Sequence, residues 1–167
     1  MISRVLVVCA GNVCRSPMVA ALLTRSLQSV AVESAGITAL VGHAADPIAV
    51  DLMRERGLDI QSHRARQLLS WMPATSDLVF VMDGLQRRHL EQRFATLHGR
   101  IYRLGDLPTT SHSGTGFDIP DPYLKDRESF KESLRLIEAS VEGWSKRIND
   151  ICGTAAGPNL TVGTSSS

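Results

Sequence analysis

Residues that can bind and attack a phosphoryl group occur together near the start of the chain, in the stretch Val8-Cys9-Ala10-Gly11-Asn12-Val13-Cys14-Arg15-Ser16-Pro17. Five residues separate Cys9 from Arg15. A cysteine thiolate is a nucleophile, and a guanidinium can donate two parallel hydrogen bonds to two oxygens of one phosphate. This spacing predicts a loop that brings both side chains around a single tetrahedral oxyanion.

The other residues of this loop fit the same chemistry. Gly11 and Asn12 adopt left-handed backbone angles at low cost, so successive N–H groups can turn inward as a nest for an anion. Ser16 is predicted to cap a helix, with Pro17 in its first turn. Because a helix N-terminus attracts anions, the phosphoryl group would lie at the start of this helix. The same dipoles favour the thiolate form of Cys9.

A buried structural cysteine beside a surface arginine is the alternative interpretation of Cys9 and Arg15, because free cysteine is among the most buried residue types. A strand before the loop and a helix after it favour the oxyanion site. A zinc site that uses Cys9 and Cys14 is disfavoured, since no further Cys or His pair follows at zinc-finger spacing. The loop also lacks the Gly-Lys-Ser/Thr of nucleotide-binding loops. We therefore expect neither a metal nor a cofactor.

Four short apolar runs have the length and composition of buried strands. They are Val5–Val8, Val30–Val32, Leu78–Val81 and Ile101–Leu104. Segments of helical period lie between them, and this alternation is typical of a parallel sheet covered by helices. The sequence predicts an α/β, three-layer doubly wound fold with a four-stranded parallel sheet and helices on both faces. Such folds bind ligands beyond the carboxyl ends of the strands.

The helical segments have recognisable ends. Asp46-Pro47 predicts a capped helix that stops at Gly57, and Asp83 predicts another that ends near Gly99. This second helix would carry the apolar residues Leu85, Leu90 and Phe94. A last helix is predicted over residues 126–152, with an apolar stripe formed by Phe130, Leu134, Ile137, Val141, Trp144, Ile148 and Ile151. The stripe could dock a partner helix, but such a stripe more often packs on its own sheet.

Length and composition predict one globular domain. A chain of 167 residues with 43% apolar and 21% charged residues fits a single domain over residues 1–152, followed by an uncharged, flexible tail over 153–167. A net charge of +1 gives no reason to expect nucleic acid or an anionic membrane as partner. Three cysteines favour a reducing compartment. No apolar run has the length of a membrane span. The expected location is the cytoplasm.

The chain resembles the low-molecular-weight protein tyrosine phosphatases over residues 1 to about 150. The loop from Cys9 to Pro17 is similar to the signature of that family, and four further motifs occur in the family's order. They are Glu33-Ser34-Ala35-Gly36, Ser62-His63-Arg64-Ala65-Arg66-Gln67, Val81-Met82-Asp83 and Asp121-Pro122-Tyr123. The motifs most resemble the bacterial branch that serves capsule and exopolysaccharide production. This implies phosphotyrosine in an autophosphorylating bacterial tyrosine kinase as the substrate.

The resemblance implies a role for each site residue. Cys9 would attack phosphorus and form a phosphocysteine, while Asp121 would protonate the leaving phenolate and then activate water. Taken alone, Asp121-Pro122 could be an ordinary turn. Arg15 and the loop would hold the phosphoryl oxygens. The loop residues with this role would be Ala10, Gly11, Asn12, Val13, Cys14 and Ser16.

The resemblance also assigns supporting residues. Ser34 and His63 would join Asn12 and Ser16 in a hydrogen-bond network that fixes the loop, although His63 alone would be taken for a surface histidine. Cys14 would be able to form a disulfide with Cys9 that protects it from over-oxidation. The cleft would be lined by Leu40 and Tyr123.

Three other functions use the same loop or part of it. Arsenate reductases of this superfamily need further cysteines, and none lies between Cys14 and Cys152. Arginine phosphatases of the family carry threonine where this chain has Val13, whose apolar side chain suits an aromatic ring. A phosphate-binding module without turnover would need neither the nucleophile Cys9 nor the acid Asp121.

Overall fold

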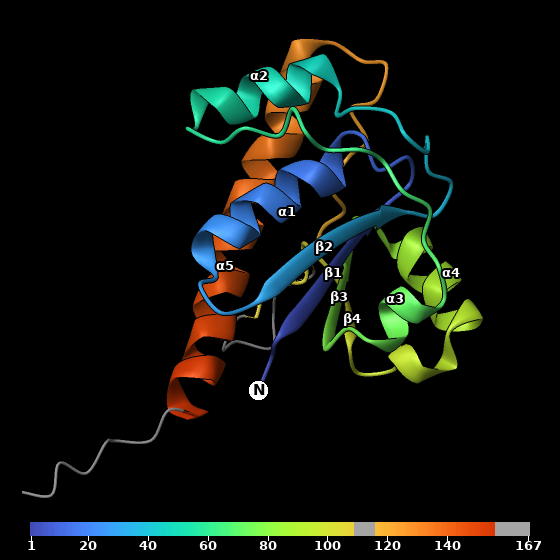
Figure 1. The fold of residues 1–167 in the computed structure, drawn as a ribbon, viewed down its shortest axis with the longest axis vertical. Helices are drawn as coiled ribbons and strands as arrows, with labels where there is room; N and C mark the ends of the chain where they lie inside the picture. Colours follow the sequence, from blue (N-terminus) through green and yellow to red (C-terminus); the bar gives the residue numbers. More distant parts are fainter. Residues whose placement is uncertain (109–115, 156–167) are drawn as a thin grey trace, which may run out of the picture.

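The fold is built on a parallel sheet of four strands in the order β2-β1-β3-β4 (Figure 1). A computed structural model of the chain describes residues 1–108 and 116–155. The strands are β1 (Arg4–Cys9), β2 (Ala31–Gly36), β3 (Leu78–Val81) and β4 (Ile101–Arg103). All three strand pairs are parallel, which confirms the predicted sheet. β2 begins within the predicted run and continues through the Glu33–Gly36 motif to Gly36.

Helices cover both faces of the sheet, so the predicted three-layer arrangement is confirmed (Figure 1). One face packs against α1 (Arg15–Ser26), α2 (Pro47–Glu55) and α5 (Arg127–Ala155). The other face packs against α3 (Trp71–Ala74), α4 (Gly84–Arg93) and the 3₁₀ helix η1 (Ala95–Leu97). Side chains alternate across β1. Val5 and Val7 therefore join the first core cluster, whereas Leu6 and Val8 join the second.

The apolar stripe of the last helix packs in the core, which is the interpretation that the sequence favoured over docking of a partner helix. Six of its seven predicted residues are buried, and Ile151 is half-buried. Trp144 packs edge-on against Phe80 of β3 at 4.8 Å between ring centroids, and its Nε1 donates to the carbonyl of Leu104 at 2.9 Å. No helix in the described ranges is long and apolar enough to cross a membrane.

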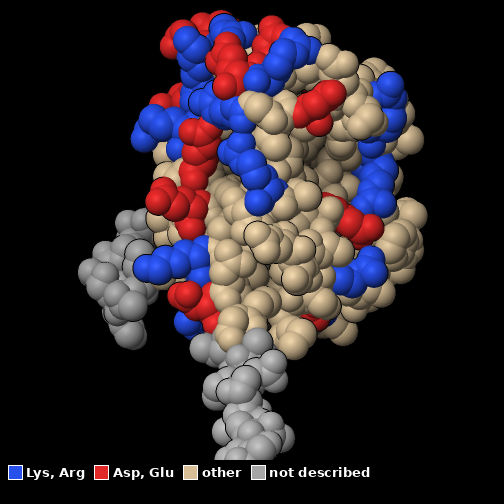
Figure 2. Space-filling model, turned by 60° about the vertical axis from the view of Figure 1, so that its left-hand side comes forward, with Lys and Arg blue, Asp and Glu red and all other residues tan. Residues whose placement is uncertain are grey.

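Charged side chains are interspersed on the face that Figure 2 shows, with no broad area of one sign. Ion pairs join two of the outer helices, α2 and α5. Arg127 at the start of α5 pairs with Asp51 and Glu55 of α2, and Arg56 pairs with Glu138 of α5. Because these side chains are partly exposed, we assign the pairs a small share of the stability.

Two predicted helix starts are confirmed and one is wrong. The carboxylates of Asp46 and Asp83 cap α2 and α4 by accepting from the backbone N–H groups of Ile48 and Gln86 at 2.9 and 2.8 Å. Ser16 does not cap α1. The helix begins at Arg15, so Ser16 lies inside its first turn, and its hydroxyl instead contacts other residues of the loop.

Helix ends differ more from the sequence prediction. α4 ends at Arg93 rather than near Gly99, because the chain turns at Phe94 into η1. Leu85, expected on the apolar side, is 72% exposed. α5 continues through Ala155, beyond the predicted end at residue 152. The remainder of the predicted tail, residues 156–167, lies outside the described residues.

The register of the sheet brings the chemistry-bearing segments together. Cys9 at the end of β1 lies opposite Gly36 at the end of β2. A Cβ on Gly36 would lie 2.5 Å from the carbonyl oxygen of Ala10, so a side chain here would displace the loop after β1. The backbone N–H groups of Ile37 and Thr38 donate to the carbonyls of Cys9 and Ala10 at 3.0 and 3.1 Å. The segment after β2 therefore supports that loop.

Candidate active site

A cavity of about 170 Å³ opens where the loop after β1 leaves the sheet and enters α1. The residues that line it include all three of the predicted catalytic side chains and both of the predicted wall residues. They are Cys9, Ala10, Gly11, Val13, Cys14, Arg15, Thr38, Leu40, Asp121 and Tyr123. A cavity at the carboxyl end of a parallel sheet and at a helix N-terminus is where an anion is expected to bind.

Asn12 is the centre of the network that holds the loop. It is fully buried with a φ of 59°, a left-handed conformation that asparagine adopts more readily than most residues. Its Nδ2 donates to the hydroxyls of Ser16 and Ser34 at 2.7 and 3.0 Å. Its Oδ1 accepts from the backbone N–H of Arg66 at 2.9 Å, and Nε2 of His63 lies 2.7 Å from its carbonyl oxygen. The structure therefore brings together all four residues of the predicted network.

The Ser16 hydroxyl links this network to Cys9. Its oxygen lies 2.9 Å from Sγ of Cys9 and accepts from Nδ2 of Asn12. Because Asn12 is the donor in that second contact, the hydroxyl proton of Ser16 is available to donate to the sulfur. A hydrogen bond to a thiolate stabilises its charge. The serine that fails to cap α1 is thus directed at the sulfur of Cys9.

Arg15 is a buried cation with several partners. Its side chain is 4% exposed, and its Nη1 donates to the carbonyl of Ile119 at 2.8 Å. Nη1 also lies 3.9 Å from Oδ2 of Asp83, and Nη2 lies 3.4 Å from Oδ2 of Asp121. These contacts hold the guanidinium at the cavity, because an unpaired buried charge would be costly.

Asp121 fits both interpretations that the sequence left open. Its Oδ1 accepts a hydrogen bond of 3.1 Å from the backbone N–H of Tyr123, which is the contact of an Asx turn. Its Oδ2 faces Arg15, and the side chain is 49% exposed. A carboxyl group that lines the cavity and also reaches solvent can give a proton to a group bound in the cavity and take another from water.

Apolar side chains form the mouth of the cavity. Leu40 packs close to Gly11, because a Cβ added to Gly11 would lie 3.7 Å from Cγ of Leu40. Tyr123 is 41% exposed beside Asp121. Val13 completes the apolar lining. These walls suit an aromatic ring better than a charged group.

Cys14 is also buried at the cavity, as the residue before α1. Burial raises the pKa of the Cys14 thiol well above its usual range, and the carboxylate of Asp46 adds to this. The thiol is therefore neutral, whereas the nearby Cys9 has a hydroxyl donor on its sulfur. Both cysteines are free, so the disulfide between them stays a prediction.

Sequence reasoning missed three contributors to the site. Thr38 lines the cavity, Asp83 contacts Arg15, and Arg66 supports Asn12 and also donates from Nε to the carbonyl of Ser34 at 2.8 Å. Asp83 was predicted as a helix cap, and both Asp83 and Arg66 lie in motifs shared with the family, but neither had been given a role at the site. Within residues 1–108 and 116–155, no three His, Cys, Asp or Glu side chains are grouped as metal ligands.

Comparison with known proteins agrees with this geometry. Residues 4–151 match the family described as low molecular weight phosphotyrosine protein phosphatase. The chain is 46% identical over 148 residues to the probable low molecular weight protein-tyrosine-phosphatase EpsP of Ralstonia nicotianae. The aligned region covers 89% of this chain and 97% of the relative.

Solved structures give the same result. The crystal structure of the tyrosine phosphatase Wzb from Escherichia coli K30 in complex with sulphate superposes with a TM-score of 0.80 at 32% identity, covering 89% of this chain and 99% of that one. The YwlE arginine phosphatase from Geobacillus stearothermophilus superposes with a TM-score of 0.84 at 28% identity, covering 94% and 99%. The resemblance stated from the sequence is confirmed. The chain belongs to the low-molecular-weight phosphotyrosine protein phosphatase family.

Proposed function

We propose that this protein-tyrosine phosphatase transfers the phosphoryl group of phosphotyrosine first to Cys9 and then to water. The observation that carries the proposal is the convergence of Cys9, Arg15 and Asp121 on one cavity of about 170 Å³. A nucleophile, a cation and a carboxyl group there supply what an aryl phosphate needs for hydrolysis without a metal.

In the first step, Sγ of Cys9 attacks phosphorus from the floor of the cavity. The P–S bond forms as the bond from phosphorus to the phenolic oxygen breaks, and Asp121 donates a proton to the departing oxygen. Arg15 and the backbone N–H groups of the loop stabilise the three equatorial oxygens, which carry the charge of the transition state. The ring of the leaving group rests between Leu40 and Tyr123.

In the second step, water attacks the phosphocysteine. Asp121, now a carboxylate, takes a proton from that water, and Cys9 leaves as a thiolate. The Ser16 hydroxyl, 2.9 Å from the sulfur, stabilises the returning negative charge. The second step thus uses the same residues in reversed proton roles.

Hydrolysis of phosphoarginine is the second candidate, because an arginine phosphatase has a closely similar fold. The lining argues against it. Val13 and Leu40 offer apolar surface, and a guanidinium leaving group placed there would lose its hydrogen bonds to water. Beyond the loop that binds the phosphoryl group, the polar groups of the lining are the hydroxyls of Thr38 and Tyr123 and the carboxyl of Asp121, which the proposal uses as the general acid.

Arsenate reduction is disfavoured by the position of Cys152. Its Sγ donates to the carbonyl of Ile2 at 3.5 Å, just before the start of β1, whereas Cys9 is the last residue of that strand. The two sulfurs therefore lie at opposite ends of the sheet. A disulfide relay needs sulfurs within bonding distance.

The expected result of a substrate panel is selective turnover of phosphotyrosine. Phosphotyrosine, phosphoserine and phosphoarginine peptides would be compared with arsenate by kcat/KM. Phosphoserine should be hydrolysed at least about 100-fold more slowly, because an alkoxide is a poorer leaving group and leaves the apolar walls unfilled. If the kcat/KM for phosphoarginine equalled or exceeded that for phosphotyrosine, the proposal would be wrong, and the chain would be assigned as an arginine phosphatase.

The physiological substrate is proposed to be an autophosphorylating tyrosine kinase of exopolysaccharide production. Similarity to relatives named EpsP and Wzb supports this choice, together with the motifs that resemble the bacterial branch. The open mouth of the cavity supports a protein substrate, since the lining residue Tyr123 is 41% exposed and Val41, which follows the lining residue Leu40 in sequence, is 66% exposed. Loss of phosphotyrosine from such a kinase on incubation with this chain is the corresponding assay.

A further inference from the structure

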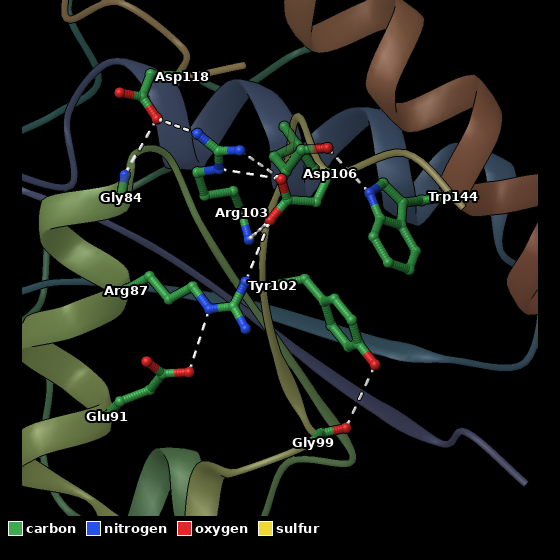
Figure 3. Close-up of polar contacts among 10 residues, drawn as sticks. Gly84, Arg87, Glu91, Gly99, Tyr102, Arg103, Asp106, Asp118 and Trp144 are labelled. Atoms are coloured by element: carbon green, nitrogen blue, oxygen red, sulfur yellow. Dashed lines mark hydrogen bonds and ion pairs between the residues drawn. The ribbon is translucent and has the colours of Figure 1, made fainter. Parts of the chain in front are cut away.

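A network of charged side chains lies at the end of β4, outside the cavity that holds Cys9 (Figure 3). Arg103, the last residue of β4, donates from Nε and Nη2 to Oδ1 of Asp106 at 3.0 and 2.7 Å. Its Nη1 donates to Oδ1 of Asp118 at 3.0 Å. We call Arg103, Asp106 and Asp118 the β4 clamp, because they join the end of the strand to the segment that leads to Asp121.

Asp118 ties the β4 clamp to the start of α4, as Figure 3 shows. Its Oδ1 also accepts a hydrogen bond of 3.1 Å from the backbone N–H of Gly84, the first residue of the helix. The cap of the same helix, Asp83, lies 3.9 Å from Nη1 of Arg15. One helix N-terminus therefore contacts both the clamp and the arginine of the anion-binding loop.

The backbone between Asp118 and Asp121 is held on both sides. The N–H of Ile119 donates to the carbonyl of Met82 at 2.8 Å, and the carbonyl of Ile119 accepts from Nη1 of Arg15 at 2.8 Å. This short segment therefore runs from the β4 clamp, past the catalytic arginine, directly to the acid.

The Asp121 carboxyl has few contacts of its own. It accepts from the N–H of Tyr123, two residues away, and lies 3.4 Å from Arg15 while remaining 49% exposed. The carbonyl of Pro120, the residue before it, accepts from the hydroxyl of Ser133 at 2.8 Å. Among residues 1–108 and 116–155, Arg15 is the one partner of this carboxyl that is distant in sequence, so the position of the carboxyl depends on the backbone that carries it.

Two glycines allow this segment to lie directly on the clamp. A Cβ on Gly116 would lie 2.0 Å from Oδ1 of Asp106 and 2.7 Å from Nη2 of Arg103. A Cβ on Gly105 would lie 2.0 Å from the carbonyl oxygen of Phe117. Neither distance is possible without movement. The segment before Asp118 therefore contacts the Arg103–Asp106 pair at van der Waals range.

We infer that the β4 clamp positions the general acid, with Arg103 as a positioning residue that acts through Asp118 and the backbone of Ile119 on Asp121. The inference rests on the proposed function, in which Asp121 donates the proton. Arg103 does not line the cavity, so it has no direct contact with substrate. Arg103 therefore affects the reaction only by setting the position of the Asp121 carboxyl. Misplacement of a catalytic group by about 1 Å can cost roughly 100-fold in rate.

Substitution of Arg103 is expected to leave the fold intact. The Arg103 and Asp106 side chains are 24% and 23% exposed, and Asp118 is 56% exposed. The pair with the exposed Asp118 contributes little to stability, and Asp106 keeps a second cation, Nη1 of Arg87, at 3.4 Å when Arg103 is replaced. Asp118→Asn is a second, milder variant, because an amide oxygen can still accept from Gly84 while the charge that attracts Arg103 is removed. Melting temperatures close to that of the parent enzyme are the expected readout for both.

The test compares kcat/KM for two aryl phosphates whose leaving groups differ in basicity. Phenyl phosphate needs a proton from the acid, whereas 2,4-dinitrophenyl phosphate departs without one. Arg103→Gln is expected to lower kcat/KM about tenfold for phenyl phosphate and less than about twofold for the dinitrophenyl ester. Asp118→Asn should show the same pattern. Arg54→Gln breaks an exposed pair with Asp51 on α2 and should leave both values unchanged.

A double variant separates positioning from a general disturbance of the site. If Arg103 acts through Asp121, Arg103→Gln should change kcat/KM for phenyl phosphate by less than about twofold once Asp121→Asn is present. The inference would be overturned if Arg103→Gln lowered kcat/KM equally for both esters. It would also be overturned if Arg103→Gln still lowered kcat/KM for phenyl phosphate tenfold in the Asp121→Asn background. The parent enzyme must turn over both esters for this test, so failure here differs from failure of the proposed function.

Discussion

Replacement of Cys9 by serine is expected to abolish hydrolysis of aryl phosphates while inorganic phosphate still binds. A serine hydroxyl is a weak nucleophile without a general base beside it, and the buried Ser16 hydroxyl cannot serve as one. We expect kcat to fall by roughly four orders of magnitude or more, as is common when a nucleophile is removed. The loop N–H groups and Arg15 stay in place, so phosphate remains bound.

The measurement pairs initial rates with the dissociation constant of inorganic phosphate. Cys152→Ser is the matched control, because Cys152 lies at the far end of α5 and contacts the carbonyl of Ile2. That variant should keep the parent kcat. Substantial residual turnover in Cys9→Ser, with phosphate still bound, would remove Cys9 from the role of nucleophile.

Asp121→Ala is expected to slow phosphotyrosine hydrolysis by roughly two to four orders of magnitude, through loss of general acid catalysis. The limb of the pH–rate profile that requires a protonated acid should disappear with it. The loss should shrink for esters of acidic phenols, which depart without a proton. Rates that match the parent enzyme at every pH would exclude Asp121 from the mechanism.

Asp121→Asn refines this experiment. An amide oxygen can still accept from the N–H of Tyr123, so the turn observed at 3.1 Å is preserved while the proton is not available. Asp121→Asn and Asp121→Ala should therefore show similar losses. A nearly active asparagine variant would indicate that Asp121 matters for the turn rather than for proton transfer.

Local sequence signals predicted the sheet well. Apolar β-branched runs identified β1 and β3, and the Asp46-Pro47 and Asp83 caps marked the starts of α2 and α4, because each signal lies within a few residues of the structure it specifies. Ser16 shows the limit of such signals. A serine before proline favours a cap, but the buried contacts with Cys9 and Asn12 determine its orientation.

Contacts between distant segments could not be predicted from local pattern. Arg66 reaches Asn12 across the end of the sheet, and Thr38 enters the cavity only because β2 pairs with β1 in one register. His63 was identified only through a family resemblance, since an isolated histidine carries no such signal. The β4 clamp was missed for the same reason, as Arg103 and Asp118 meet through tertiary structure.

The most direct test of the account is to trap the phosphoenzyme. Asp121→Asn would be mixed with 2,4-dinitrophenyl phosphate, quenched in acid within the first turnover, and digested for mass spectrometry. This variant lacks the base for the second step, so one phosphoryl group should accumulate on the peptide that contains Cys9. Turnover without any labelled cysteine, or a label on another residue, would contradict the account.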